Sequence, residues 1–176
     1  RVQRVSRVVR SVAVPTVAAL PGAAAGARVA LGLSWEVRVA AATSVPTTGY
    51  ARVGLPGEYG ASWLLTRVVG PGRARELMLT SERVTAARAL DIGLVNRVVP
   101  ADGLMAATRE LIAPLANGPR VAYGYIKANL DEALDIDHAT AIDREAERML
   151  RCQTTFDHKE AAKAFVEKRA PQFEGR

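Results

Sequence analysis

The order of the predicted elements along the chain limits its fold more than any other feature. Short apolar runs that end at glycine, proline or polar residues, as strands do, lie in the first hundred residues. They are 14–20, 37–42, a few residues around Val45, and 95–99. Later segments carry apolar residues at helical spacing and are 101–117, 119–130, 136–152 and 157–169. With no internal repeat, this order predicts an α/β core over residues 1–100 and a helical cap or assembly region over residues 101–176.

Local signals place further helices and turns. An amphipathic helix is predicted over 1–12, because apolar residues recur there opposite arginines; they are Val2, Val5, Val8, Val9 and Val12. Gly70-Pro71-Gly72 is predicted as a turn before a short helix, and Thr85 as the N-cap of the next one. Asp157 and Glu160 have the spacing of a capping box and are predicted to start the last helix.

The chain carries excess positive charge. Its 176 residues include 24 Lys and Arg against 18 Asp and Glu, for a formal net charge of +6. The arginines are scattered and interrupted by acids, whereas a nucleic-acid surface prefers a clustered patch with aromatic residues for stacking. RNA binding is therefore not favoured. A ligand that is phosphorylated or linked to CoA would suit the same excess.

Metal, disulfide and membrane chemistry have little support in the sequence. Cys152 is the only cysteine and lies in a predicted helix, which favours a packed thiol over a nucleophile. His138 and His158 lack metal-ligand spacing and are predicted on the surface. No apolar run approaches the length of a membrane span, so a cytoplasmic protein is expected. Because residue 1 is Arg rather than Met, we expect a fragment, a processed product or the ordered part of a longer protein.

A run of small residues, Gly22 to Ala27, precedes the apolar positions of a short predicted helix. Small side chains let the backbone amides of a helix N-terminus face a ligand, which suits an oxyanion or a phosphate. The run lacks the Gly-Lys-Ser/Thr ending of a phosphate loop and the GxGxxG spacing of a dinucleotide site. It is a weak motif taken alone.

The stretch Gly54 to Gly70 combines a glycine-rich loop, one acid at Glu58 and a segment predicted to be a buried helix. Beside Leu55, Tyr59 and Trp63, a carboxyl group would lose water, and such desolvation favours a pKa useful for proton transfer. The alternative is an exposed acid that is favoured before a helix by the helix dipole. Both interpretations of Glu58 stay open on spacing alone.

Four segments, in this order and spacing, resemble the enoyl-CoA hydratase/isomerase (crotonase) superfamily over nearly the whole chain. They are Pro15–Ala19 with Gly22–Gly26, Arg52–Pro56 with Gly60–Leu65, Ala87–Val99, and Ala164–Phe173. The resemblance implies a fold that stacks ββα units into a spiral, of which residues 1–100 would form the C-terminal part. It also implies that the C-terminal helices build homotrimers or homohexamers.

The chemistry implied by the resemblance is an oxyanion hole, in which two backbone amides hold a thioester carbonyl. One donor would be the amide of Ala27, and the other would lie in a segment upstream of Arg1. Family hydratases use two glutamates, at positions that fall here on Ala30 and Tyr50. Neither residue can act as a carboxylate base. Some isomerases instead place an acid where this chain has Glu58, and one carboxylate there can move a proton between two carbons.

The resemblance also implies the ligand contacts. Gly26, Tyr50 and Tyr59 would lie along the acyl-CoA substrate. Phe165 would contact the adenine of a CoA bound to an adjacent subunit, and Lys168 one of its phosphates. The alternatives are a core phenylalanine and a solvated lysine. No cofactor is implied beyond the CoA of the substrate, which would be an acyl thioester of fatty-acid or aromatic-acid breakdown.

Several residues near the implied site depart from the family pattern. Arg28 replaces a preferred glycine, Trp35-Glu36 replaces a small residue followed by aspartate, and Pro46 replaces phenylalanine. Two functions remain open as a result. One is an acyl-CoA isomerase or hydratase that uses Ala27 and Glu58. The other is a catalytically silent CoA-binding or scaffolding subunit of the same fold, which the loss of both hydratase glutamates favours.

Overall fold

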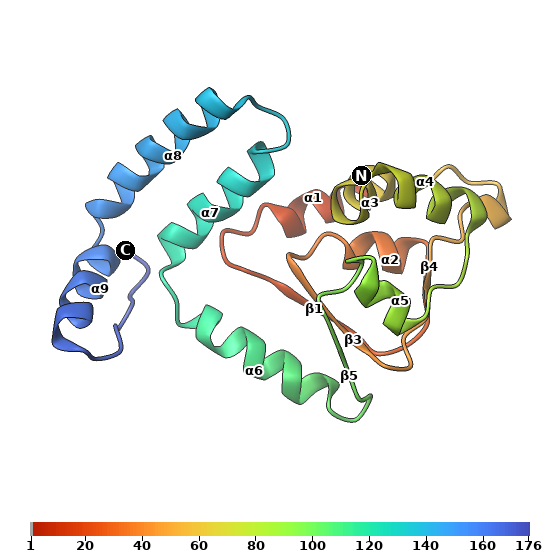
Figure 1. Cartoon of the computed structure of the whole chain (residues 1–176), viewed down its shortest axis with the longest axis horizontal. Coiled ribbons are helices and arrows are strands. Elements are labelled where there is room, and N and C mark those ends of the chain that lie inside the picture. Colours follow the sequence, from red (N-terminus) through yellow and green to blue (C-terminus); the bar gives the residue numbers. More distant parts are fainter. Residues whose placement is uncertain (1) are drawn as a thin grey trace. The chain divides into compact units, whose positions relative to one another are not determined.

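The computed structural model describes residues 2–176, with side chains from residue 3 onward. The chain forms two compact units, coloured by sequence in Figure 1. The first comprises the residues up to Ser11 together with Thr16–Ile112. The second comprises Val12–Pro15 together with Ala113–Arg176.

A parallel sheet of three strands lies at the centre of the first unit. It is built from β1 (Val17–Leu20), β3 (Val37–Ala41) and β5 (Arg97–Val99), in the order β1-β3-β5. Val17 pairs with Val37 and Val39 pairs with Arg97. The central strand buries four consecutive residues, as expected when both faces of a parallel sheet are covered. The strand predictions near 17–20, 37–41 and 97–99 are confirmed, with shorter ends.

A second, two-stranded parallel sheet supports the loop before α2 (Ala27–Gly32). It pairs β2 (Ala24–Ala25) with β4 (Pro46–Thr47), so that Ala24 faces Pro46 and Ala25 faces Thr47. Pro46 is the first residue of β4. Its carbonyl oxygen accepts a hydrogen bond from the amide of Val84 (2.8 Å), which ties the loop before α5 to the same sheet.

Helices cover the sheet of the first unit and bury its main apolar cluster. They are η1 (Val2–Arg4), α1 (Val5–Arg10), α2, η2 (Ala51–Val53), α3 (Ala61–Val69), α4 (Pro71–Thr80) and α5 (Ala86–Asp91). Leu64 and Leu65 of α3 and Leu77 of α4 are almost fully buried in this cluster. The side chain of Thr85 accepts a hydrogen bond from the Arg88 amide, which confirms the predicted N-cap.

Two helix predictions in this unit differ from the structure in detail. Pro71-Gly72 was expected in a turn, but α4 begins at Pro71, where proline's missing amide costs no hydrogen bond. The first segment was predicted to be an amphipathic helix with its valines opposite the arginines; a helix is present, but Val8 is 63% exposed and Ser6 is the buried residue. Residues 2–4 form a tighter 3-10 turn, so the α-helical part begins only at Val5. The Val2 side chain lies outside the described residues.

Four helices complete the chain: α6 (Leu104–Ala116), α7 (Arg120–Glu132), α8 (His138–Gln153) and α9 (Phe156–Glu167). In the second unit α7 and α8 lie side by side (Figure 1). Glu132 of α7 joins them, because its carboxylate lies 2.7 Å from both Arg144 and Arg148 of α8. Hydrogen bonds from these two arginines lower the pKa of Glu132 to about 2.

The predicted capping box of the last helix is wrong. Thr155 is the N-cap of α9, and its hydroxyl accepts from the His158 amide (3.1 Å). Asp157 is instead buried, where its carboxylate accepts from the amides of Glu174 (2.7 Å) and Gly175 (3.0 Å). The chain end therefore folds back onto α9. None of the described helices is long and apolar enough to span a membrane.

Candidate active site

The loop before α2 has a backbone that requires glycine at its last residue. Gly26 is the N-cap of α2 with φ +52° and ψ −117°. Its amide donates to the carbonyl oxygens of Thr47 (3.3 Å) and Thr48 (3.1 Å), next to the β2–β4 pair. A Cβ atom at Gly26 would lie 3.5 Å from Cε1 of Tyr50 and 3.7 Å from Oε1 of Glu58. The positive φ and the close neighbours both favour glycine here.

The amide of Ala27 is the first one of α2. The first amides of a helix have no partner within the helix. Among the backbone hydrogen bonds of residues 2–176, none is donated by the Ala27 amide, and the residue is half-buried. This amide is therefore available as a hydrogen-bond donor to a ligand.

A turn of several left-handed residues holds Glu58 next to Gly26. Gly57 has φ +129°, Tyr59 has φ +51° and Gly60, the N-cap of α3, has φ +76°. The Glu58 carbonyl accepts from the Ala61 amide (2.9 Å), and the Tyr59 amide donates to the side chain of Gln3 (2.5 Å). These bonds fix the turn, so the half-buried Glu58 carboxylate lies beside the loop that ends at Ala27.

The surroundings of Glu58 differ from those predicted. Leu55 and Trp63 were expected to desolvate the carboxylate, but both side chains are exposed. The Trp63 ring instead packs against the guanidiniums of Arg67 (3.6 Å) and Arg10 (5.1 Å). The period of the helix explains the difference, because a residue two positions into α3 can point outward while Leu64 and Leu65 point inward.

Tyr50 is the most buried polar side chain of the site. It is 3% exposed, and its hydroxyl makes no hydrogen bond of full geometry with the side chains and backbone that the structure describes. Burial, reinforced by the nearby charge of Glu58, raises the pKa of Tyr50 to about 12. The phenol is therefore neutral at ordinary pH and keeps a proton to donate. Ala30 and Ala61 pack around its ring, together with the partly buried Tyr59.

The structure thus brings together five of the seven predicted site residues, namely Gly26, Ala27, Tyr50, Glu58 and Tyr59. The other two, Phe165 and Lys168, belong to the second unit. Phe165 is 85% exposed, which excludes a core phenylalanine, and Lys168 is an exposed residue with φ +53° that ends α9.

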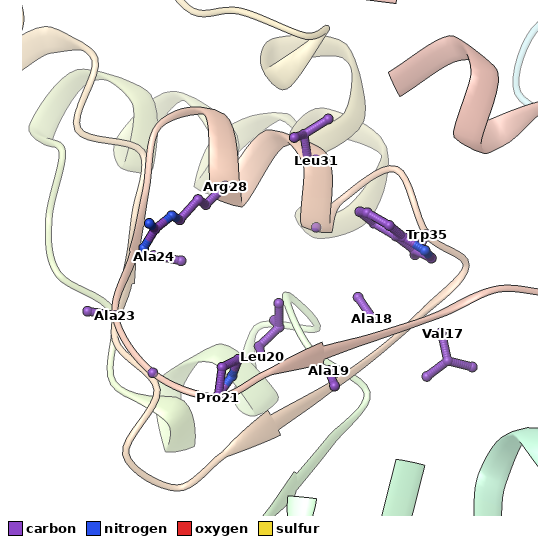
Figure 2. A pocket seen from close by; sticks show the side chains of 12 residues that line it. Val17, Ala18, Ala19, Leu20, Pro21, Ala23, Ala24, Arg28, Leu31 and Trp35 are labelled. Carbon is purple, nitrogen blue, oxygen red and sulfur yellow. The ribbon is translucent and has the colours of Figure 1, made fainter. Parts of the chain in front are cut away.

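An apolar cavity of about 490 Å³ lies beside the site and was not predicted. Figure 2 shows it between β1 and α2, with Leu20 and Pro21 on one side and Trp35 at one end. The alanines of β1 leave this space because their side chains are short. Trp35 and Arg28 depart from the family pattern and were the sequence features that could have pointed to this cavity. Their spacing in the sequence does not show that both line it.

No metal-ligand cluster accompanies the site. Among the described residues, no group of three histidine, cysteine, aspartate or glutamate side chains is placed to hold a metal ion. His138 and His158 are exposed, as predicted, and Cys152 is half-buried. The site consists of one carboxylate, one neutral phenol and one free backbone amide.

The fold matches solved structures of enoyl-CoA hydratases. A putative enoyl-CoA hydratase of Streptomyces coelicolor is 38% identical, with a TM-score of 0.94, over 99% of this chain and 64% of that one. The enoyl-CoA hydratase of Bacillus anthracis is 28% identical, with a TM-score of 0.95, over 99% of this chain and 68% of that one. These similarities confirm the predicted crotonase-like α/β fold.

Sequence comparison identifies the family. The model of the enoyl-CoA hydratase/isomerase family matches residues 1–176. A crotonyl-CoA hydratase of Syntrophomonas wolfei is 33% identical over 174 residues, and a 1,2-epoxyphenylacetyl-CoA isomerase of Escherichia coli is 32% identical over 162. The protein belongs to the enoyl-CoA hydratase/isomerase family. It covers 66% of the first relative's length and 62% of the second's, with 97% and 92% of its own chain matched.

Proposed function

We propose that the protein acts on acyl-CoA thioesters and shifts a double bond by proton transfer through Glu58. The observation that carries this proposal is the position of Glu58 Oε1, 3.7 Å from the Cβ position of Gly26 and thus beside the free amide of Ala27. A carboxylate next to an oxyanion donor can remove a proton from the carbon α to a thioester.

The proposed steps use this chain's residues as follows. The Glu58 carboxylate takes a proton from the α-carbon of a 3-enoyl thioester, and the electron pair of that C–H bond moves onto the thioester oxygen. The Ala27 amide donates a hydrogen bond to the developing oxyanion. Glu58 then returns the proton to the γ-carbon, and the charge on oxygen collapses to leave a 2-enoyl thioester. No water is consumed, and no atom is gained or lost. An oxyanion hole takes two donors, and we assign one of them to this chain.

The same geometry argues against the two-glutamate route to hydration. That route places two carboxylates around a water molecule, at the positions occupied here by Ala30 and Tyr50. Ala30 is fully buried and carries no titratable group, and the raised pKa of Tyr50 keeps its phenol protonated. Tyr50 and Tyr59 are expected to line the acyl group, with the Tyr50 hydroxyl as a hydrogen-bond donor within the site.

The second unit supports a proposal about CoA and assembly. The nearly complete exposure of Phe165 and the cationic end of α9 at Lys168 suit contacts with the adenine and a phosphate of a CoA held by another copy. Helices α7 and α8 also expose large apolar side chains, including Leu130, Met149 and Leu150. Such a surface is typical of a subunit interface. A homotrimer or homohexamer is therefore part of the proposal, with no cofactor beyond the CoA of the substrate.

A catalytically silent CoA-binding subunit is the second candidate, favoured by Ala30 and Tyr50. The two candidate functions are tested by incubating the purified protein separately with 2-enoyl- and 3-enoyl-CoA thioesters and measuring the masses of the products by mass spectrometry. Conversion of the 3-enoyl to the 2-enoyl thioester without a change in mass supports isomerisation. A product heavier by one water supports hydration and contradicts the proposed single-carboxylate route. CoA binding with no turnover of either thioester supports the silent subunit.

A further inference from the structure

A second cavity of about 390 Å³ opens on the first unit, where the β2–β4 pair meets η2 and the loop before α5. Three arginines line it, and each comes from a different element: Arg28 from α2, Arg52 from η2 and Arg83 from the loop. Figure 2 shows the Arg28 side chain reaching from α2 toward Ala24.

Within residues 3–176, the three guanidiniums have no acidic partner. Many other arginines pair with acids, such as Arg88 with Glu76 and Glu82. Among residues 3–176, whose side chains the structure describes, none of Arg28, Arg52 and Arg83 forms an ion pair or a side-chain hydrogen bond. The three side chains are exposed, so water screens part of their mutual repulsion, and an anion between them would lower it further. A planar guanidinium also binds carboxylate and phosphate oxygens with two parallel hydrogen bonds.

The position of the cavity ties it to the proposed catalytic loop. Ala25 and Arg28, which line it, immediately flank Gly26 and Ala27 in the sequence. Thr47, also in the lining, accepts a hydrogen bond from the Gly26 amide through its carbonyl (3.3 Å). One wall of the cavity is therefore the same loop that presents the Ala27 amide. A ligand group in this cavity would lie close to a thioester held at Ala27, whereas the long pantetheine arm separates the phosphates of CoA from the thioester.

We propose that this three-arginine cavity binds an oxyanion group of the ligand, and that the group is a second carboxylate on the acyl chain. The proposal rests on the proposed function, because the thioester is placed at Ala27. The favoured substrates would then be CoA thioesters of dicarboxylic acids. Arg28, which departs from the glycine preferred in the family, would be a specificity residue.

The test measures binding rather than turnover. Dissociation constants are measured for two saturated thioesters of equal chain length, glutaryl-CoA and pentanoyl-CoA, and for inorganic pyrophosphate. The proteins compared are the unaltered chain, Arg52→Ala, Arg83→Ala and the double variant. Arg73→Ala removes an exposed arginine of α4 outside the cavity and serves as the matched control. Arg28 is left in place because it adjoins Ala27.

Glutaryl-CoA is expected to bind at least tenfold more tightly than pentanoyl-CoA. Each arginine removed should weaken glutaryl-CoA binding about tenfold, and the double variant should lose the preference, because hydrogen bonds to a charged group are among the stronger ones. The control variant Arg73→Ala should keep the preference for glutaryl-CoA. Equal losses for both thioesters, with pyrophosphate competing against both, would support the oxyanion site but assign it to a phosphate of CoA.

Unchanged dissociation constants for all three probes in the double variant would overturn the proposal. A change of oligomeric mass in sedimentation, with unchanged probe affinities, would also overturn it and would indicate an acidic surface of a second copy as the partner. Because the probes are saturated, binding is scored without catalysis. A protein with no enoyl-CoA turnover that still prefers glutaryl-CoA in an arginine-dependent way would contradict the proposed function and leave this inference standing.

Discussion

Replacing Tyr50 by phenylalanine should not lower the free energy of unfolding, whereas it should lower turnover if the hydroxyl acts in the site. The hydroxyl of Tyr50 is buried and makes no hydrogen bond of full geometry among the described residues, so folding removes it from water with at most a weak hydrogen bond from the Glu58 backbone in return. Such an unsatisfied group costs about 1–3 kcal/mol. Tyr50→Phe removes the hydroxyl but keeps the ring against Ala30 and Ala61. We therefore expect the free energy of unfolding to stay the same or to rise by about 1 kcal/mol, while turnover falls if the hydroxyl serves the site.

The free energy of unfolding at alkaline pH tests the same prediction in a second way. The pKa of Tyr50 is raised from 10 to about 12 in the folded protein, so the neutral phenol is favoured there. The stability that the neutral phenol contributes is fully present below pH 10 and is lost as pH rises toward 12. With about 1.4 kcal/mol per pKa unit, the loss should approach about 2–3 kcal/mol. Tyr50→Phe should lack this part of the decline.

Urea unfolding at pH 7, 9 and 11 measures both effects, with Tyr59→Phe as the control on the neighbouring, less buried ring. A loss of more than about 1 kcal/mol at pH 7 in Tyr50→Phe would refute the reasoning. It would show that the hydroxyl has a structural partner, and Tyr50 would then be a core residue that happens to lie beside Glu58.

Two further predictions concern the second unit. The pKa of Glu132 is lowered to about 2 by Arg148 and Arg144, so its stabilising effect is present above about pH 4.5 and is lost as pH falls toward 2. Glu132→Gln should therefore lower the melting temperature at pH 6 and have little effect at pH 2.5 in calorimetry, and an equal effect at both values would contradict the ion-pair account. Asp157→Ala should cost about 2 kcal/mol, because two backbone amides lose a buried carboxylate acceptor. It should also make residues 174–176 more accessible to proteases, whereas unchanged digestion would show that this segment is held by other contacts.

The sequence predicted the fold where local signals and burial agree. The strands around Val39 and Val98 were found because short apolar runs are bounded by turn residues. Thr85 was found as an N-cap because its hydroxyl bonds to a nearby amide. Asp157 was misassigned because its partners, the amides of Glu174 and Gly175, are distant in the sequence and no local pattern announces them.

The site was predictable only in part, for a similar reason. The proximity of Glu58 to Gly26 depends on long-range contacts between loops, and only the family resemblance suggested it. The expected apolar shell of Leu55 and Trp63 was wrong because sequence proximity does not determine which side chains point inward. The convergence of Arg28, Arg52 and Arg83 could not be predicted, since they come from three separate elements.

The central claim is that the Glu58 carboxylate carries the proton, and the turnover number of Glu58→Gln on a 3-enoyl-CoA thioester tests it most directly. Glutamine keeps the size of the side chain but cannot take up the proton. Glu110→Gln, at an exposed position of α6, is the matched control. The account predicts a fall of about 10²- to 10⁴-fold for Glu58→Gln, the usual contribution of a positioned acid/base, and no change for Glu110→Gln. Full activity in Glu58→Gln would contradict it.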